Sequence, residues 1–184
     1  AQEDLKASVG EEALGAVLKD DPELLGKLVS QGLDLGSLVS GGQTALNAAI
    51  NNDSIKIVKY LFEKHPGQVK LSGNSGVMME TLNSIYEDPA NATPNKKAIV
   101  KLLIKEFSGS INELKNEFAP LHTAISNQDL DLLQFLLKEG ANIELEGPQG
   151  ITPLIMAILV SDHVHGHEGS HSASNHEHET GHGH

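Results

Sequence analysis

A repeated spacing of 33 residues is the feature that most restricts how this chain can fold. One set of positions, at which a helix is predicted to begin, consists of Ala45, Met78, Pro120 and Pro153. A second set, apolar positions in the helix that follows, consists of Leu25, Val58, Val100 and Leu133. In both sets the separations are 33, 42 and 33 residues. This agreement on the period, and on the place of a nine-residue excess, indicates that the chain repeats one supersecondary unit.

The best preserved unit runs from residue 118 to residue 146. Pro120 stands where a first helical turn tolerates a missing N–H, and apolar residues follow it at helical spacing. The segment Asn-Gln-Asp at 127–129 interrupts that pattern and caps a second, leucine-rich helix. Gly140 then supplies a left-handed residue after the helix. One helix pair of this kind cannot bury both its faces, so the pattern predicts neighbours of the same design.

The opening at 119–122, Ala-Pro-Leu-His, and the close at 140–143, Gly-Ala-Asn-Ile, resemble the T-P-L-H and G-A-D-V motifs of ankyrin repeats. The resemblance implies an all-α ankyrin-repeat solenoid of about four to five helix-turn-helix units joined by finger loops. We place the repeat domain at 1–162, with units at 11–40, 41–73, 74–115 and 116–148 and a partial unit at 149–162. Residues 163–184 form a separate His-rich tail.

Three units are expected to depart from the pattern. The first lacks the Thr-Pro-Leu opening, which suits a capping unit with its helix starting near Glu11. The third carries the nine extra residues, which we place in a polar loop at 86–97 rich in turn residues. In the fifth, glycines and a serine occupy the place of the second helix near 163–171. The apolar first helix of that unit therefore needs cover from the tail or from a partner.

Charge and composition exclude several classes of function. The net charge is −12, and all 13 basic residues are Lys, so a phosphate-reading surface for nucleic acid or anionic membrane is disfavoured. The longest apolar run, 151–160, is too short for membrane insertion. The chain has no Cys and none of the common catalytic or phosphate-binding motifs, so we predict that it is not an enzyme. The resemblance gives His122 a structural role, hydrogen-bonded to neighbouring backbone.

The tail contains eight of the ten histidines of the chain. Its candidate metal ligands are His163, His165, His167, His171, His176, His178, His182 and His184. In an extended chain the His-x-His pairs would point to one side, where neutral imidazoles suit Zn²⁺ or Ni²⁺. No cofactor is required. Two other interpretations stay open: a solvated low-complexity segment that picks up metal adventitiously, and a proton sensor.

The resemblance implies that the array binds a protein through its inner helices and loop tips, near 37–43, 70–77, 113–118 and 145–151. The candidate contact residues are Asn47, Asn51, Asn74, Glu80, Asn83, Tyr86, Glu113, Glu117, Ser126 and Glu146. An acidic surface favours a basic partner. Within the insertion, Tyr86 is a candidate aromatic anchor, because the chain has few aromatic residues.

The first residues, Ala-Gln-Glu-Asp, are typical of a chain left by signal peptidase, and equally of a trimmed chain. Export would make the protein similar to bacterial periplasmic ankyrin proteins. One use of that class is self-protection, in which the array binds and blocks a peptidoglycan hydrolase of the same cell. The alternatives are a cytoplasmic location and a metal-handling protein in which the array is a scaffold for the His-rich tail.

Overall fold

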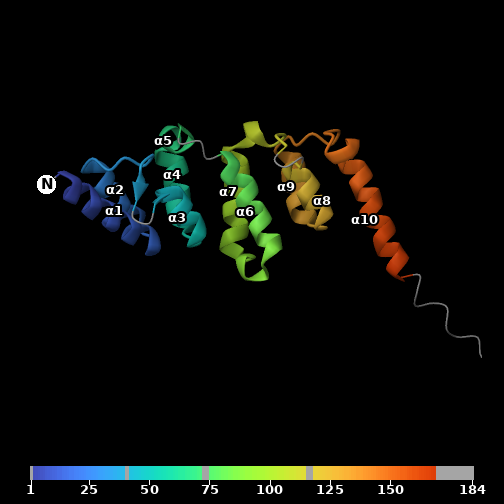
Figure 1. Ribbon diagram of the computed structural model, residues 1–184, viewed down its shortest axis with the longest axis horizontal. Coiled ribbons are helices and arrows are strands. Elements are labelled where there is room, and N and C mark those ends of the chain that lie inside the picture. Colours follow the sequence, from blue (N-terminus) through green and yellow to red (C-terminus); the bar gives the residue numbers. More distant parts are fainter. Residues whose placement is uncertain (1, 40–41, 72–74, 115–117, 169–184) are drawn as a thin grey trace, which may run out of the picture.

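The computed structural model describes residues 2–39, 42–71, 75–114 and 118–168, with side chains described for most of 8–161. Helix pairs stand side by side in an elongated row, from α1 at one end to α10 at the other (Figure 1). The predicted all-α ankyrin-repeat solenoid is confirmed. A short antiparallel pair, β1 (Leu38–Val39) with β2 (Gln43–Thr44), forms the first finger loop.

Each of the first four units contributes one helix to each of two layers, and the fifth contributes α10 alone. The inner layer consists of α1 (Gln2–Leu18), α3 (Ala45–Asn51), α6 (Ser75–Glu87), α8 (Pro120–Ser126) and α10 (Pro153–Glu168). The outer layer consists of α2 (Pro22–Ser30), α4 (Ile55–Lys64), α7 (Pro94–Glu106) and α9 (Leu130–Lys138). The outer helices pack in an unbroken series, α2 on α4, α4 on α7 and α7 on α9. Among the inner helices, close packing joins α1 to α3, α6 to α8, and α8 to α10.

The turn between the two helices has the same conformation in units one, two and four. A residue with positive φ stands at the matching position of each, namely Asp20, Asp53 and Gln128. The side chains at these turns also join neighbouring units. The Oδ1 atom of Asp20 accepts the Ile57 N–H at 3.0 Å, and the buried Ser54 hydroxyl donates to the Val17 carbonyl at 2.6 Å. The turns therefore satisfy helix-end donors and carbonyls across the unit boundary.

One continuous apolar core runs between the layers. Its largest fully buried side chains come from every unit up to α9, and they include Leu25, Leu46, Leu61, Leu82, Leu103, Leu121 and Leu136. Met78 and Met79 are buried in the third unit, where their flexible side chains fill the core. The connections between later units are helical turns: α5 (Pro66–Leu71), which the sequence did not predict, η2 (Ser108–Ser110) and η3 (Pro148–Gly150).

The prediction of a loop at 86–97 is wrong. Helix α6 continues to Glu87, a 3₁₀ turn η1 (Pro89–Asn91) follows, and α7 already begins at Pro94. The extra residues lengthen both helices to 13 residues, against 7 and 10 in the second unit. In Figure 1, α6 and α7 reach beyond their neighbours at the lower edge. The start of α7 follows local rules, because Thr93 caps it and Pro94 occupies its first turn.

Side chains at the lengthened start of α7 form polar contacts with the second unit. Thr93 Oγ1 donates to Asp53 Oδ2 at 2.6 Å, and Lys96 Nζ lies 2.9 Å from Asp53 Oδ1. Lys96 also donates to the Ile50 carbonyl, and only 6% of this residue is exposed. A buried ammonium needs such partners because its desolvation is otherwise uncompensated. The insertion is therefore part of the packing between units.

Both ends of the array differ from expectation. Helix α1 begins at Gln2, well before Glu11. At the other end α10 is continuous across the predicted boundary at 162 and ends at Glu168. The backbone of His163, His165 and His167 is therefore helical, where an extended segment had been considered. Residues 1, 40–41, 72–74, 115–117 and 169–184 lie outside the described part.

The buried ion pair of Lys96 predicts a large effect on stability. Lys96→Met leaves Asp53 without its cation and removes one of the donors to the Ile50 carbonyl, so we expect a loss of roughly 2–4 kcal/mol in the free energy of unfolding. The control, Asp131→Asn, breaks the Lys101–Asp131 pair of 2.7 Å, in which Asp131 is 78% exposed, and should cost less than about 0.5 kcal/mol. Urea unfolding measures both; equal stability of the two variants would contradict a structural role for Lys96.

Candidate binding surface

A polar pocket opens on the inner layer between α3 and α6. Its volume is about 300 Å³, and its lining consists of Gln43, Asn47, Ile50, Asn51, Val77, Glu80, Thr81, Ser84 and Lys96. The pocket lies where close packing of the inner helices is interrupted, while α4 and α7 remain in contact behind it. Repeats two and three are thus held together by their outer helices, and their inner helices leave room for a ligand group.

Amide and hydroxyl groups give this pocket its chemistry. The Asn51 side-chain amide donates to Gln43 Oε1 at 3.3 Å, at the end of α3. Ser84 Oγ donates to the Thr81 carbonyl within α6 at 2.6 Å. The ammonium of Lys96 reaches the pocket wall, but Asp53 and the Ile50 carbonyl already compensate it. The pocket therefore offers hydrogen-bond partners to a polar side chain and no uncompensated Lys charge.

Three of the predicted contact residues, Asn47, Asn51 and Glu80, come together in this pocket. The others do not line it. Asn83 is half-buried on α6, and Ser126 is exposed at the end of α8. Glu113 and Glu146 are exposed on separate connections, and Asn74 and Glu117 lie outside the described residues. The structure thus brings three of the ten predicted residues together in one region, between α3 and α6.

Sequence reasoning missed several lining residues, among them Thr81, Ser84 and Lys96. Lys96 had been placed in a loop, so nothing in the expected register brought it near α3. The sequence did contain a local signal: Thr93 followed by Pro94 is a typical cap and first turn, and it sets Lys96 within the first turn of a helix. Contact with the Ile50 carbonyl, 46 residues away, has no such local signal.

Tyr86 is held inside the array. It is half-buried near the end of α6, and its hydroxyl donates to Asp129 Oδ2 at 2.7 Å. Burial, and then the hydrogen bond and charge of Asp129, raise the pKa of Tyr86 above its usual range. Asp129 also caps α9, because its Oδ1 accepts the Leu132 N–H at 3.1 Å. Tyr86 therefore joins the third unit to the turn of the fourth, rather than standing out as an anchor.

The structural role predicted for His122 is confirmed. The imidazole is fully buried, and its Nδ1 accepts the Ala119 N–H at 3.2 Å. Its Nε2 lies 3.2 Å from the Ile151 carbonyl, so a neutral ring protonated on Nε2 satisfies both contacts. His122 thus connects the openings of the fourth and fifth units.

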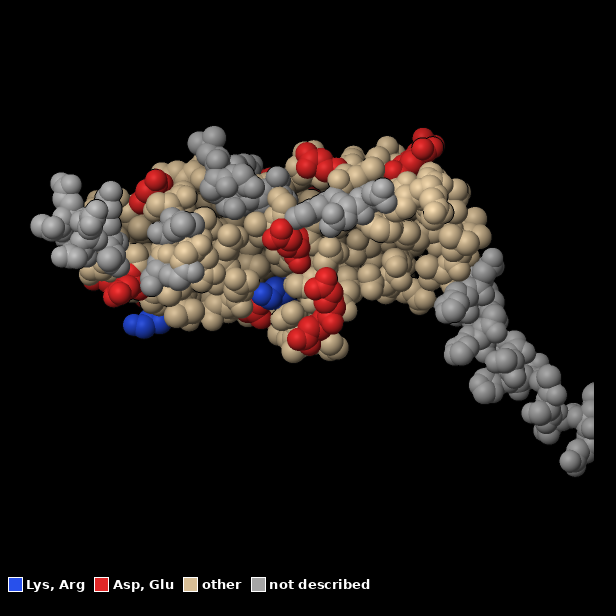
Figure 2. All heavy atoms as spheres, viewed as in Figure 1, with Lys and Arg blue, Asp and Glu red and all other residues tan. Residues whose placement is uncertain are grey.

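Acidic side chains lie along the length of the face drawn in Figure 2, with few lysines among them. In this view the end of the array near α8 to α10 shows acidic side chains at its upper edge, and the surface below them is without charged side chains. Where side chains are described, no group of three or more His, Asp or Glu lies close enough to hold a metal ion. The predicted ligands His171, His176, His178, His182 and His184 lie outside the described residues, as do the side chains of His163, His165 and His167.

The fold and the repeated turns define an architecture, the ankyrin-repeat solenoid. Ankyrin repeats indicate a protein-interaction module, and the family is generally not catalytic. Residues 90–166 match the family model "Ankyrin repeats (3 copies)". Among the helices of the described part, none combines the length and apolar character needed to cross a bilayer.

Two curated proteins are similar to this chain, and the name of one of them contains the term ankyrin repeat. The chain is 25% identical over 117 residues to alpha-latrocrustotoxin-Lt1a of Latrodectus tredecimguttatus, which covers 62% of this chain and 7% of the toxin. It is 23% identical over 129 residues to the "Putative ankyrin repeat protein" of Rickettsia bellii (strain RML369-C), which covers 69% of this chain and 35% of that protein. The match therefore spans a minor part of either relative.

The buried phenol of Tyr86 predicts a specific effect at alkaline pH. Because its pKa is raised in the folded state, the unfolded chain loses this proton first, and stability falls as pH rises above about 10. Tyr86→Phe removes the hydrogen bond, which should cost about 1 kcal/mol at pH 8, and it also removes the titration. The stability difference between wild type and Tyr86→Phe should therefore shrink between pH 8 and pH 11 in urea unfolding. A constant difference would contradict this account.

Proposed function

We propose that the protein is a non-catalytic binding module that holds a basic protein partner against the inner face between α3 and α6. The observation that carries this proposal is the polar pocket, which brings Asn47, Asn51 and Glu80 together on an array of ankyrin repeats. The side-chain oxygens of these residues are suited to accept hydrogen bonds from a Lys or Arg side chain. Its location where α3 and α6 separate gives a partner side chain access between two units.

Charge supports the same kind of partner. The chain has a net charge of −12, and acidic groups follow the visible face. Such a field attracts a basic protein, raises its rate of association and disfavours acidic competitors. Long-range attraction and the polar pocket contribute separately to the binding of a partner. The first depends on the total charge of the chain, and the second depends on the positions of the pocket residues.

We further propose that this partner is a peptidoglycan hydrolase and that the protein is an exported, periplasmic inhibitor that protects the cell producing it. The resemblance to bacterial periplasmic ankyrin proteins of the self-protecting type supports this step. In this role the partner's active site would be covered when the inner face engages it. No cofactor takes part.

Substitution in the pocket tests the proposal. The double variant Asn47→Lys with Asn51→Lys should weaken binding to a purified basic peptidoglycan hydrolase at least tenfold in calorimetry, because it places two like charges where the partner's cation would enter. The matched control, Gln31→Lys with Gln134→Lys, makes the same charge change at exposed outer positions. Equal affinity of the two variants would remove the pocket from the interface. Unchanged hydrolysis of isolated peptidoglycan at saturating wild-type protein would rule out inhibition.

A second candidate function rests on the concentration of eight histidines within residues 163–184. We propose that this tail binds Zn²⁺ or Ni²⁺ while the array serves as its scaffold. Metal binding requires neutral imidazole, so affinity should fall as pH drops from about 7 to about 5. Calorimetry compares the wild type with a variant in which these eight histidines are Asn. Equal metal binding by the two proteins would exclude the tail as the site.

A further inference from the structure

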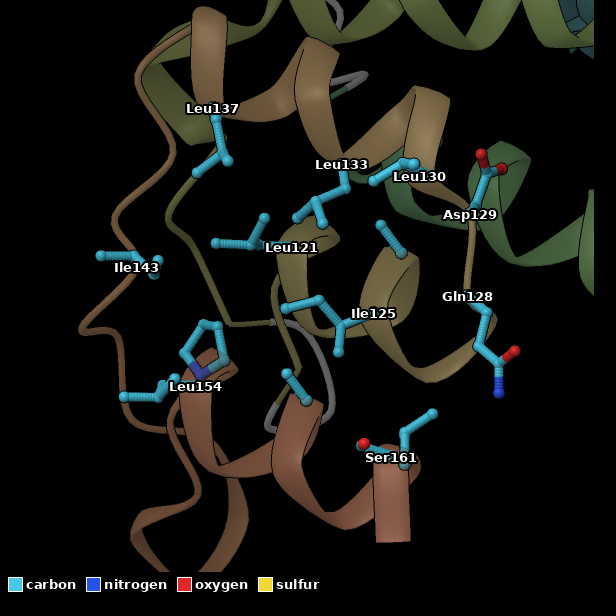
Figure 3. A pocket seen from close by; sticks show the side chains of 14 residues that line it. Leu121, Ile125, Gln128, Asp129, Leu130, Leu133, Leu137, Ile143, Leu154 and Ser161 are labelled. Atoms are coloured by element: carbon cyan, nitrogen blue, oxygen red, sulfur yellow. The ribbon is translucent and has the colours of Figure 1, made fainter. Parts of the chain in front are cut away.

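An apolar groove lies at the last units of the array, far from the polar pocket. Its volume is about 470 Å³, and it is formed between α8, α9 and α10 (Figure 3). The side chains that give it its apolar character are Leu121, Ile125, Leu130, Leu133, Leu137 and Leu154. Ile143 closes one side, and polar atoms are confined to Gln128, Asp129 and Ser161.

This end carries most of the exposed apolar surface. Ten large apolar side chains are exposed among the residues whose side chains are described, and seven of them belong to α9, α10 or the connection between them. These seven are Leu130, Leu137, Ile143, Leu154, Ile155, Ile158 and Leu159, with exposed fractions of 43–64%. An apolar area gathered in one place indicates an interaction surface rather than the scattered exposure of ordinary proteins.

The groove marks the position of a helix that the fifth unit does not supply. In the outer layer α4 packs on α2, α7 on α4, and α9 on α7. The next outer helix would lie on α9, but the chain continues α10 to Glu168 instead of turning back. Helix α10 packs closely on α8. Consequently one side of α9 and the facing side of α10 lack the cover that every earlier pair has.

The composition of residues 169–184 does not match an apolar groove, because their only apolar side chain is Ala173 and eight of them are His, Glu or Asn. Helix α10 itself, in contrast, has the properties of a suitable occupant. Ile155, Ile158 and Leu159 form an exposed stripe at helical spacing, and 153–161 contains no charged residue. They do not line the groove of their own chain, so they are available to another molecule.

We propose that two copies of this chain associate end to end about a two-fold axis, with α10 of each copy lying in the groove of the other. One chain leaves both an apolar groove and an apolar stripe uncovered, and a two-fold contact covers both in both copies. A helix from an unrelated protein would fill the groove and leave Ile155, Ile158 and Leu159 in water. The groove lining and the stripe contain one charged residue between them, Asp129, which fits contact between two chains that are each strongly acidic.

Analytical ultracentrifugation tests the proposal on the full chain. The wild type should sediment at twice 19.6 kDa at micromolar concentration, and Leu130→Glu in the groove or Ile158→Glu on the stripe should weaken the dimer at least tenfold. The matched control is Leu18→Glu, a position of similar exposure (56%) on α1 at the other end of the array, which should remain dimeric. Circular dichroism checks that all variants fold, as expected at exposed positions.

Added salt gives an independent readout, because screening weakens repulsion between two acidic chains while apolar contacts persist. The dimer should tighten from low salt to about 0.15 M salt. A wild type that stays at 19.6 kDa across the concentration range would overturn the proposal and assign the groove to a different protein. Mass that grows without limit would overturn the two-fold arrangement, and a dimer unaffected by Leu130→Glu and Ile158→Glu would place the contact elsewhere.

Discussion

Burial of each helix pair by the pairs on either side is the constraint on which this structure depends. A single pair has apolar side chains on two faces, and its contacts are with its immediate neighbours. Leu61 of α4 and Leu103 of α7, for example, are fully buried in a core that no single unit could enclose. The interior units therefore support one another, whereas the fifth unit has one helix, α10, in the described part of the chain. The exposed leucines and isoleucines of α10 belong to that unit.

Polar contacts at the turns decide how the units are aligned. Apolar contacts are non-directional, whereas the bonds of Asp53 to Thr93 and Lys96, and of Tyr86 to Asp129, require particular positions. These bonds use the residues of the insertion, so the departure from the 33-residue period strengthens both boundaries of the third unit. The polar pocket lies beside these bonds, between α3 and the lengthened α6, with Lys96 of α7 in its lining.

The two surfaces identified on this protein rest on different physical effects. The pocket between α3 and α6 is small and polar, in a chain of high negative charge, and it suits selective recognition of a cation on a partner. The groove between α9 and α10 is apolar and nearly uncharged, and it suits contacts driven by removal of surface from water. Because they lie at separate unit boundaries, the binding of a basic partner and the association of two chains need not compete.

The sequence by itself determined the class of fold, because local helix signals and a fixed period identify the repeated unit, and its resemblance to ankyrin repeats implied the role of His122. It also placed Asn47, Asn51 and Glu80 on the inner face. Only the tertiary structure decided that the insertion extends two helices, that Lys96 reaches Ile50, and that α10 continues in place of a second helix. The physical reason is that period and helix propensity are properties of neighbouring residues. The partners of Lys96 and Tyr86 lie about 45 residues away and are fixed only when the units pack.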